Sequence, residues 1–401
     1  MKKIYFLILV LFTSVNLYSQ DIKVGALLSL TGEWSSLGIN SRAALEIAKA
    51  DIEKYLTSIN SKARIDLRIE DTKLDPQTAL DKLKLLNLAG YKIVIGPQSS
   101  AEILGIKKYA DENNMLIISQ SSTASDLSVA GDNIFRLCPD DLGEAKAITS
   151  LILDDNIKYL IPVYRLDIGN EGLYKSLNDV ATKEKLFVSE PITYTDDSEN
   201  FDNILDKLKI KLNEALSKFP NTQIGVYLAA FDENMEIFRE AYKFPELEKV
   251  KWYGSDGAAL SKVLISNSVA SDFAISVDYP CPIFGLENNA SEKWMPVKKA
   301  IFESTRMEAD AFALATYDAL WIVYLSQISN GISKDINVIK NSFKGIASNY
   351  YGLTGWTHLN EAGDREFGNF DYWIVRKNSD GNYEWVKVDS YDGLSGTIIG
   401  N

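Results

Sequence analysis

Two hydroxyl-rich segments carry the side chains best suited to binding a small anion. Residues 96–100 read Gly-Pro-Gln-Ser-Ser and follow an apolar run, and residues 119–125 read Ser-Gln-Ser-Ser-Thr-Ala-Ser and follow another. Both segments have the predicted order strand, hydroxyl-rich turn, helix. Hydroxyl groups and the free N–H groups of a helix N-terminus favour a negative charge such as a carboxylate. For any one of these residues the alternative is a helix-capping role.

The elements that must position these turns form an alternating pattern. Short apolar runs at residues 22–28, 64–69, 92–95 and 116–118 predict strands, and helix-spaced apolar residues lie between them. A second set of strands is expected near residues 159–163, 225–228, 251–253 and 273–277. The sequence therefore predicts an α/β fold with two lobes and mainly parallel sheets. In such sheets ligands bind beyond the carboxyl ends of the strands, which is where both hydroxyl-rich turns lie.

The first 20 residues have the pattern of a secretory signal peptide. Lys2 and Lys3 precede an apolar run, and small Ser19 stands before Gln20 as the expected cleavage point. The run is shorter than the ~20 residues of a membrane-spanning helix, although an uncleaved anchor is the alternative. No later segment is expected to span a bilayer. We therefore expect a soluble periplasmic or secreted protein.

Composition and charge exclude several classes of function. The chain is 46% hydrophobic and 24% charged, which is typical of a globular protein. Its net charge of −13 argues against binding nucleic acid. His358 is the only histidine, so the chain has almost no histidines from which to build a Ser-His-Asp triad or a histidine-based metal site. Phosphate-binding and dinucleotide-binding glycine motifs are missing, so we expect neither an enzyme nor a cofactor or metal.

The order of several short motifs resembles the type I periplasmic binding proteins, specifically the leucine/isoleucine/valine-binding branch that serves ABC importers. The resemblance covers nearly the whole mature chain. The motifs are Gly25-Ala26-Leu27-Leu28-Ser29-Leu30-Thr31-Gly32, Glu70-Asp71 with Asp75-Pro76, residues 96–100, residues 118–123, Phe135-Arg136, Tyr253-Gly254-Ser255-Asp256-Gly257, Gly352-Leu353-Thr354-Gly355 and Gly363-Asp364. It implies two doubly wound parallel-sheet lobes joined by three crossing strands. The implied boundaries are residues 21–138 plus 282–365 for lobe 1 and 139–281 plus 366–401 for lobe 2.

The resemblance also implies a ligand site between the lobes. Ser100 and Thr123 would hold the α-carboxylate of an amino acid, and the carbonyl of Ser121 would accept from its α-ammonium. Asp256, where the family has an acidic residue, would neutralise that ammonium from the second lobe. This fits the chemistry of a buried zwitterion, which needs every donor and acceptor matched.

The part of the site that would surround the ligand side chain matches the family less closely. Phe231 and Phe312 match family positions that wall the pocket, with plain core packing as the alternative. Gln98, Ser99, Gln120 and Arg165 would surround the ligand side chain with polar groups, which favours a polar amino acid or an amide. If these side chains turn to solvent instead, a leucine-like ligand is favoured. Ile168 or Gly169 stands where the family usually has an aromatic residue.

The implied function is capture of an amino acid or a similar small molecule and its delivery to an ABC permease and its ATPase, by a protein expected to be a monomer. A ligand-sensing module for a receptor and an amide- or urea-binding protein remain as alternatives. Cys138 and Cys281 fall beside the first and second crossing strands of the family. Secretion permits a disulfide there, and two separate buried thiols are the favoured alternative.

Overall fold

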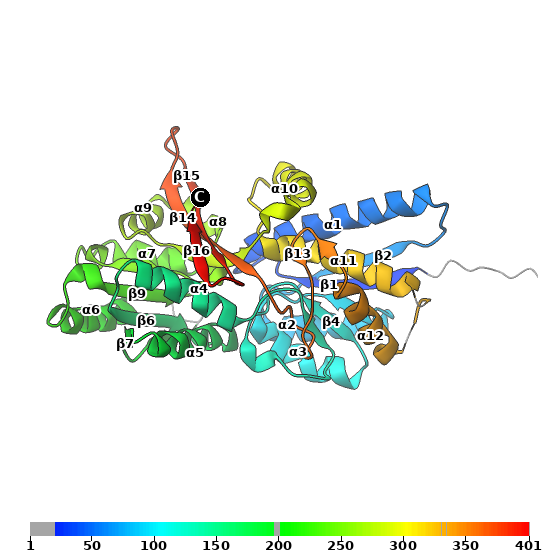
Figure 1. Ribbon diagram of the computed structural model, residues 1–401, viewed down its shortest axis with the longest axis horizontal. Helices are drawn as coiled ribbons and strands as arrows, with labels where there is room; N and C mark the ends of the chain where they lie inside the picture. The colour runs from blue at the N-terminus through cyan, green and yellow to red at the C-terminus, as the bar shows by residue number, and fades with distance from the viewer. Residues whose placement is uncertain (1–20, 196–200, 330, 334, 401) are drawn as a thin grey trace, which may run out of the picture.

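Two α/β lobes lie side by side along the long axis of the molecule (Figure 1). The computed structural model describes residues 21–195, 201–329, 331–333 and 335–400. The signal peptide expected over residues 1–20 therefore lies outside the described residues. The predicted fold class is confirmed, because each lobe contains a parallel sheet with helices on both faces.

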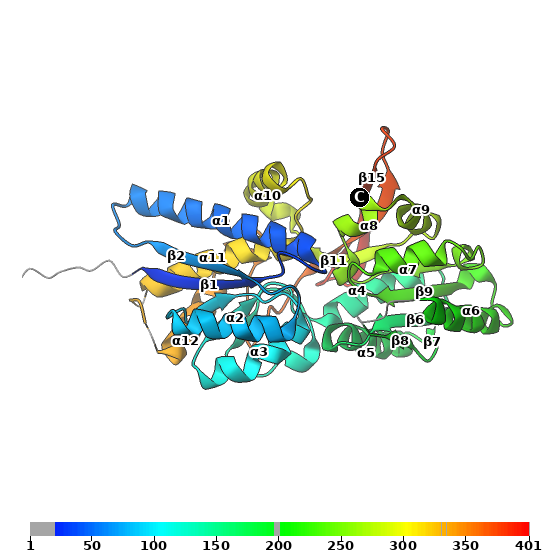
Figure 2. The same ribbon diagram turned by 180° about the vertical axis from the view of Figure 1, so that it is seen from behind.

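Lobe 1 is built on a five-stranded parallel sheet with the order β2-β1-β3-β4-β5. Strand β1, which lies between β2 and β3, is buried at every position except Lys23, as expected for a strand covered on both faces. Helices α1, α11 and α12 cover one face and α2 and α3 the other (Figures 1 and 2). The elements are β1 (Ile22–Leu28), α1 (Ser35–Ser58), β2 (Ile65–Asp71), α2 (Pro76–Leu88), β3 (Ile93–Ile95), α3 (Ser100–Glu112), β4 (Leu116–Ser119), β5 (Ile134–Arg136), α10 (Ser291–Thr305), α11 (Ala311–Ser329) and α12 (Ile336–Ala347).

Lobe 2 repeats this plan with the strand order β10-β9-β6-β7, and β8 also pairs with β6. All of these pairs are parallel. Helices α4 and α5 pack on one face, and α6, α7 and α9 on the other. The elements are α4 (Asp141–Asp154), β6 (Tyr159–Arg165), α5 (Ile168–Lys183), β7 (Phe187–Val188), β8 (Ile192–Tyr194), α6 (Asp202–Leu216), β9 (Ile224–Ala229), α7 (Asn234–Ala241), β10 (Lys251–Tyr253), α8 (Lys262–Ser266) and α9 (Ser268–Ser276).

The strand predicted over residues 273–277 is wrong. These residues form the end of α9, whose N-terminus is capped by the side chain of Asn267 accepting from the Ala270 N–H at 3.1 Å. Ala270, Phe273 and Ala274 are buried together with helical spacing. A five-residue apolar run is compatible with a strand or with a buried helix segment, and here the helix cap decides between them.

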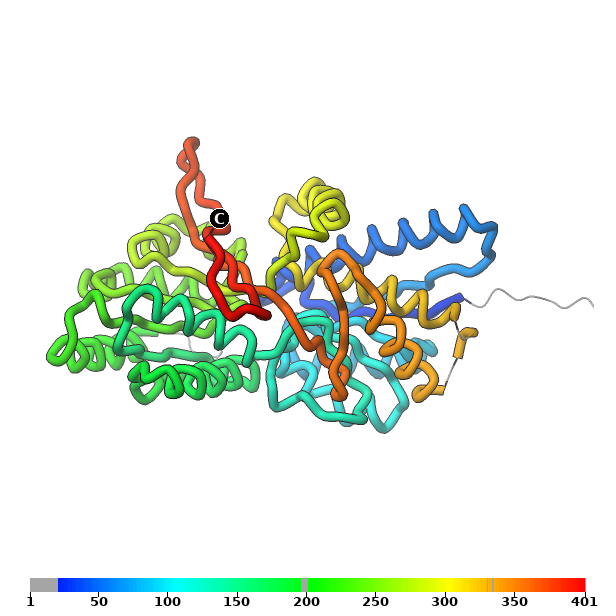
Figure 3. Tube along the Cα trace, in the orientation of Figure 1, coloured from blue at the N-terminus to red at the C-terminus, as the bar shows by residue number. Residues whose placement is uncertain are grey.

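A third, antiparallel sheet joins the lobes, with the order β11-β14-β15-β16. The chain passes between the lobes just after β5, along β11 and again just before β14, as the trace in Figure 3 shows. Its strands are β11 (Cys281–Gly285), β14 (Asn369–Lys377), β15 (Tyr383–Asp392) and β16 (Thr397–Gly400), and a short hairpin of β12 (Tyr351–Gly352) and β13 (Gly355–Trp356) precedes them. The lobe boundaries proposed from the sequence stay a prediction.

Helix α11 corrects the expectation that no later segment could span a bilayer. Its 19 residues have a mean hydropathy of 1.3, which is enough by length and composition alone. However, 78% of this segment is buried inside the protein, where α11 packs against α1 and α12. Lobe 1 therefore uses α11 as its core helix.

Cys138 and Cys281 are two separate, buried thiols, as favoured above. The Cys138 thiol donates to the Ser122 carbonyl at 3.3 Å. The Cys281 thiol lies 3.9 Å from the Tyr279 carbonyl. Burial raises the pKa of both thiols, which keeps them protonated and unreactive.

Candidate ligand-binding site

Loops from both lobes meet around one small cavity at the centre of the molecule. The cavity has a volume of about 20 Å³, which is room for roughly one water. Lobe 1 contributes Trp34, Ser99, Ser100, Ser121 and Thr123, and lobe 2 contributes Asp167, Gly169, Asn170, Leu173, Phe231 and Asp256. The two lobes are therefore in contact at the place where the sequence predicts a ligand.

The lobe 1 wall consists of the two hydroxyl-rich turns. Ser99 caps α3, and its N–H and hydroxyl donate to the Glu102 carboxylate at 3.0 and 2.8 Å. The Ser100 hydroxyl lies in the first turn, 2.9 Å from the Ser122 hydroxyl. The Ser121 hydroxyl donates to a backbone carbonyl at 3.0 Å, which fixes its loop. The capping role considered for these serines thus applies to the Ser99 side chain.

The lobe 2 wall carries two carboxylates. Asp256 begins the short helix η4 (Asp256–Ala258) after β10, and it is 5% exposed. One of its oxygens accepts from the Gly257 N–H at 2.7 Å. Asp167 caps α5 by accepting from the N–H and the side-chain amide of Asn170 at 2.9 and 2.8 Å. Both carboxylates line the cavity, so its second wall is acidic.

Further buried acids lie behind this wall. Burial raises the pKa of Asp256 to about 7, against the opposing effect of its hydrogen bond from Gly257. Burial raises the pKa of Asp141 to about 7 as well. The pKa of Glu144 is raised by burial and by the charges of Asp256 and Asp141. One oxygen of Glu144 accepts from the Asp256 N–H at 3.1 Å, so these acids form one connected group.

This group predicts an unusual pH dependence of stability. The ordinary pKa of an aspartate is 3.8, and about 7 is the value for Asp141 and Asp256 in the folded protein. Between these values the folded protein binds more protons than the unfolded chain, so the free energy of unfolding rises as the pH falls. We expect the ligand-free protein to melt at a higher temperature at pH 6 than at pH 8 in scanning calorimetry. Asp256→Asn should reduce this difference, and a lower melting temperature at pH 6 would contradict the assignment.

A charged latch closes the cavity at one side. Arg165 of lobe 2 forms an ion pair with Glu33 of lobe 1, and Glu233 and Asp167 lie 3.7 and 3.5 Å from its guanidinium. The Trp34 N–H donates to Asp232 across the lobes at 2.8 Å. These contacts hold the loop before α1 against lobe 2.

Four residues predicted for the site do not line the cavity, and one of them is Gln120, which is fully buried. Gln98 is fully buried, and its side chain accepts from the Ser29 N–H at 2.9 Å and donates to the Trp34 carbonyl at 3.3 Å. Phe312 packs behind Trp34, with ring centroids 6.4 Å apart. Arg165 belongs to the latch, where its guanidinium lies 5.4 Å from the Phe231 ring. The structure brings together Ser99, Ser100, Ser121, Thr123, Phe231 and Asp256.

Trp34, Asn170 and Leu173 also line the cavity, although the sequence patterns did not predict them. Trp34 lies just before α1 in a left-handed conformation with φ 55°, and its ring centroid is 5.0 Å from that of Phe231. The available signal was the position of Trp34 in the loop after β1, which ends at the same edge of the sheet as β3 and β4.

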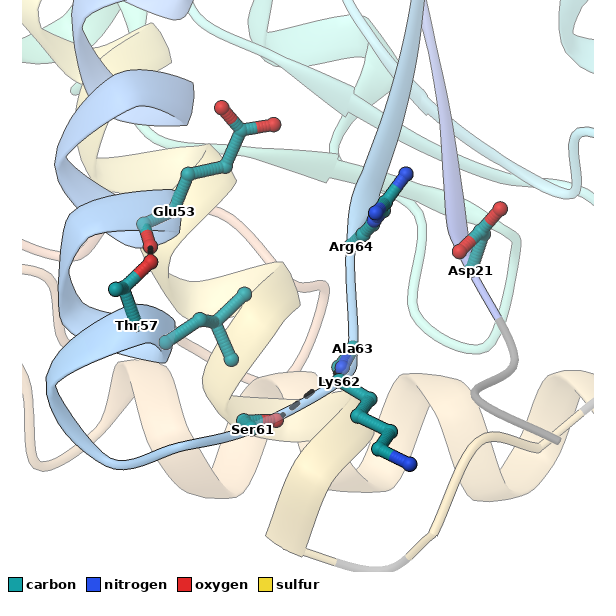
Figure 4. Close-up of a pocket in the computed structure, with 8 residues that line it drawn as sticks. Asp21, Glu53, Thr57, Ser61, Lys62, Ala63 and Arg64 are labelled. Carbon is teal, nitrogen blue, oxygen red and sulfur yellow. Dashed lines mark hydrogen bonds between the residues drawn. The ribbon is translucent and has the colours of Figure 1, made fainter. Parts of the chain in front are cut away.

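A larger hollow of ≈ 790 Å³ lies at the far end of lobe 1 (Figure 4). It is lined by the C-terminal part of α1, by residues 61–64 and by Asp21. Figure 4 shows Glu53, Lys62 and Arg64 around it, and the Ala63 N–H donates to the Ser61 hydroxyl at 3.2 Å. This hollow begins beside the first described residue and contains none of the predicted site residues.

Known proteins share this architecture. The leucine-binding protein LivK of Thermotoga maritima superimposes with a TM-score of 0.72 and 17% identity, over 94% of this chain and 99% of that chain. Protein MJ1266 of Methanocaldococcus jannaschii is 28% identical over 394 residues, which is 94% of this chain and 91% of that protein. The chemotactic substrate-binding protein BasB of Halobacterium salinarum is 26% identical over 144 residues, or 34% of each chain.

The family itself follows from a match over most of the chain. Residues 40–378 match the model described as the receptor family ligand binding region. The fold is that of the type I periplasmic binding proteins, as the resemblance implied. The chain therefore belongs to the family described as the receptor family ligand binding region.

Proposed function

We propose that this protein captures a small amino-acid-like zwitterion between its lobes outside the cytoplasm and delivers it to an ABC importer. The observation that carries the proposal is the composition of the cavity. Hydroxyl groups and a helix N-terminus line its lobe 1 wall, and carboxylates line its lobe 2 wall. A zwitterion matches these two walls in polarity, because each of its charges meets the opposite polarity. The lobes must separate to admit it, since the cavity has room for only about one water.

In this proposal the carboxylate of the ligand binds lobe 1. Ser100 lies in the first turn of α3, where backbone N–H groups are free of helical partners and the helix dipole favours an anion. Thr123 faces the same cavity from the loop after β4. Their hydroxyl and N–H groups hold the carboxylate, while the Ser121 carbonyl and the Asp256 carboxylate accept from the ammonium. The ligand thereby obtains partners that offset its desolvation.

The space for the ligand side chain is small and of mixed polarity. Trp34, Leu173 and Phe231 bound it with apolar surface, and Asp167 and Asn170 add polar atoms. Gln98 and Arg165 are engaged within the protein, so they act on the ligand through Trp34 and through the latch. We therefore propose a compact polar amino acid or amide ahead of leucine.

Closure of the lobes is part of the mechanism. The latch of Arg165 with Glu33 and the hydrogen bond from Trp34 to Asp232 form only when the lobes meet. A ligand that bridges both walls favours that closed arrangement, which is the shape a permease recognises. The proposal assigns no chemical reaction to the site.

A thermal-shift screen tests the ligand class. The panel is the twenty amino acids and small amides, added to protein that has been unfolded, dialysed and refolded. A ligand present at 100 times its Kd stabilises the protein by about 2.7 kcal/mol. We expect small polar members of the panel to give the largest shifts. Shifts with leucine, isoleucine and valine alone would overturn the polar assignment, and no shift at all would overturn the amino-acid class.

A sensing role is the second candidate, and the similarity to BasB favours it. That relative belongs by name to a chemotactic signal transduction system. Both roles use the same cavity and the same closure, so ligand binding does not separate them. Uptake of radiolabelled ligand by cells with and without the gene does: loss of uptake supports import, and normal uptake with lost chemotaxis supports sensing.

A further inference from the structure

A second concave site lies between the lobes, on the side of α10 and the β14–β15 hairpin. Its volume of ≈ 600 Å³ lies in the range of small-molecule sites, ~300–1,000 Å³. The end of α10 in lobe 1 forms one wall, and α8 with β15 forms the other. Figures 1 and 2 show α10 and the hairpin on the same side of the molecule, above different lobes. We call this site the hinge-side groove.

One part of its lining is apolar. The Trp385 indole N–H donates to the Ser261 carbonyl at 3.0 Å, and the ring is 8% exposed. Leu260 and Met307 are nearly buried beside it. Phe302 faces them from α10 and is 41% exposed. The groove therefore offers a preformed surface for an apolar body.

Two cations of the groove lack partners. Within the described part of the chain, neither the Lys262 ammonium nor the Arg306 guanidinium has a hydrogen-bonding, ionic or aromatic contact. They stand on opposite lobes, Lys262 at the start of α8 and Arg306 directly after α10. Both are exposed. In a protein with a net charge of −13, two such cations in one groove are a local reversal of charge.

Two of the three remaining charges of the groove have ionic partners. Lys387 pairs with Asp371 at 2.8 Å, and Glu308 pairs with Lys298 at 3.0 Å. Glu384 accepts weakly from the Asn378 amide at 3.4 Å. Two cations thus face one carboxylate, and the groove has a net positive charge.

We propose that the hinge-side groove binds a small organic anion with an apolar body, such as an aromatic or aliphatic carboxylate. The carboxylate pairs with Lys262 and Arg306, and the body lies against Phe302, Met307 and Trp385. An anion held by both lobes stabilises the arrangement seen here, in which the two cations line the same groove. The proposal is independent of what the central cavity binds.

A chain of hydrogen bonds connects the groove to the central cavity. Trp385 donates to the Ser261 carbonyl, and the Ser261 hydroxyl donates to Asp232. The other oxygen of Asp232 accepts from the N–H of Trp34, which lines the cavity. The Lys262 N–H also donates to the Ser36 hydroxyl at 3.3 Å, two residues from Trp34. The groove and the cavity therefore share the loop before α1.

Calorimetric titration with 3-phenylpropionate tests the proposal, with the neutral 3-phenylpropionamide as the matched probe. We expect saturable binding of one acid per chain and at least about tenfold weaker binding of the amide, since the amide loses the charged hydrogen bonds. Lys262→Ala and Arg306→Ala should each weaken acid binding about tenfold. Lys299→Ala, an exposed cation on the same α10, should leave it unchanged.

The central cavity provides the discriminating variant. Asp256→Ala should leave binding of 3-phenylpropionate unchanged, since Asp256 does not line the groove. Loss of binding in Asp256→Ala, with normal binding in Lys262→Ala and Arg306→Ala, would place the acid in the cavity and overturn the proposal. Equal binding of acid and amide, or no saturable binding at millimolar concentration, would also overturn it.

Discussion

Replacing Asp256 by alanine is expected to weaken ligand binding by roughly 30-fold to several thousandfold, equivalent to ~2–5 kcal/mol. Asp256 is 5% exposed and lies opposite the hydroxyl-rich wall of the cavity. Removing its carboxylate leaves the ligand ammonium without its charged partner inside the protein. The measurement is calorimetric titration with the ligand identified by the thermal-shift screen. Thr123→Ala should weaken binding in the same direction, since Thr123 serves the opposite charge of the ligand.

Controls separate loss of the charge from loss of the fold. Glu171→Ala removes an exposed carboxylate from α5, beside the cavity loop, and should bind normally. Asp256→Asn preserves the shape, so its affinity should be reduced while its melting temperature at pH 8 is maintained. If Thr123→Ala and Asp256→Ala both bind with near-normal affinity, these residues do not hold the ligand and the assignment of the cavity fails.

The sheets could be predicted from the sequence because buried parallel strands are continuous apolar runs. Strand β1 and strand β6 are of this kind, and their hydrophobic stretches leave no alternative. The segment at residues 273–277 was misassigned because it is too short for periodicity to separate helix from strand. The decisive signal, the Asn267 cap, lies outside that run. The antiparallel sheet depends on the pairing of β11 with β14, which are far apart in the chain and whose pairing local patterns do not reveal.

The site could be predicted in part for a similar reason. Ser99, Ser100, Ser121 and Thr123 lie just after strands β3 and β4, so the topology alone brings them to one edge. The helix expected after residues 119–125 is wrong, because only the three-residue 3₁₀ helix η1 (Ser125–Leu127) follows there. Gln98 lies in the same turn as Ser99 and Ser100, but its side chain accepts from the Ser29 N–H, 69 residues away. A contact between residues so far apart in the chain cannot be predicted from the local sequence. The partners of a polar side chain decide whether it meets the ligand or supports the wall behind it.

The structure explains two of the sequence motifs, those that contain Arg136 and Asp364. Both belong to motifs that carried the family resemblance, without an assigned role. In the structure, the guanidinium of Arg136 donates to both oxygens of Asp364, at 2.6 and 2.7 Å. Its third nitrogen donates to the carbonyls of Ser122 and Ala124, at 3.2 and 2.8 Å. One buried ion pair thus joins the end of β5, the loop of the ligand cavity and the segment leading to the third crossing.

Replacing Asp364 by alanine is therefore expected to lower the free energy of unfolding by ~3–5 kcal/mol, the usual cost of leaving one buried charge unpaired. Arg136 and Asp364 are 1% and 3% exposed, so water cannot replace the lost partner. The measurement is equilibrium denaturation by urea, followed by tryptophan fluorescence. Lys108→Ala, which breaks an ion pair on the exposed side of α3, should change stability by less than about 0.5 kcal/mol. Because Arg136 also holds the loop of Thr123, Asp364→Ala should weaken ligand binding as well, whereas Arg136→Met combined with Asp364→Leu should recover stability but not affinity. A loss of under ~1 kcal/mol in Asp364→Ala would show that the pair does not hold the lobe to the crossing.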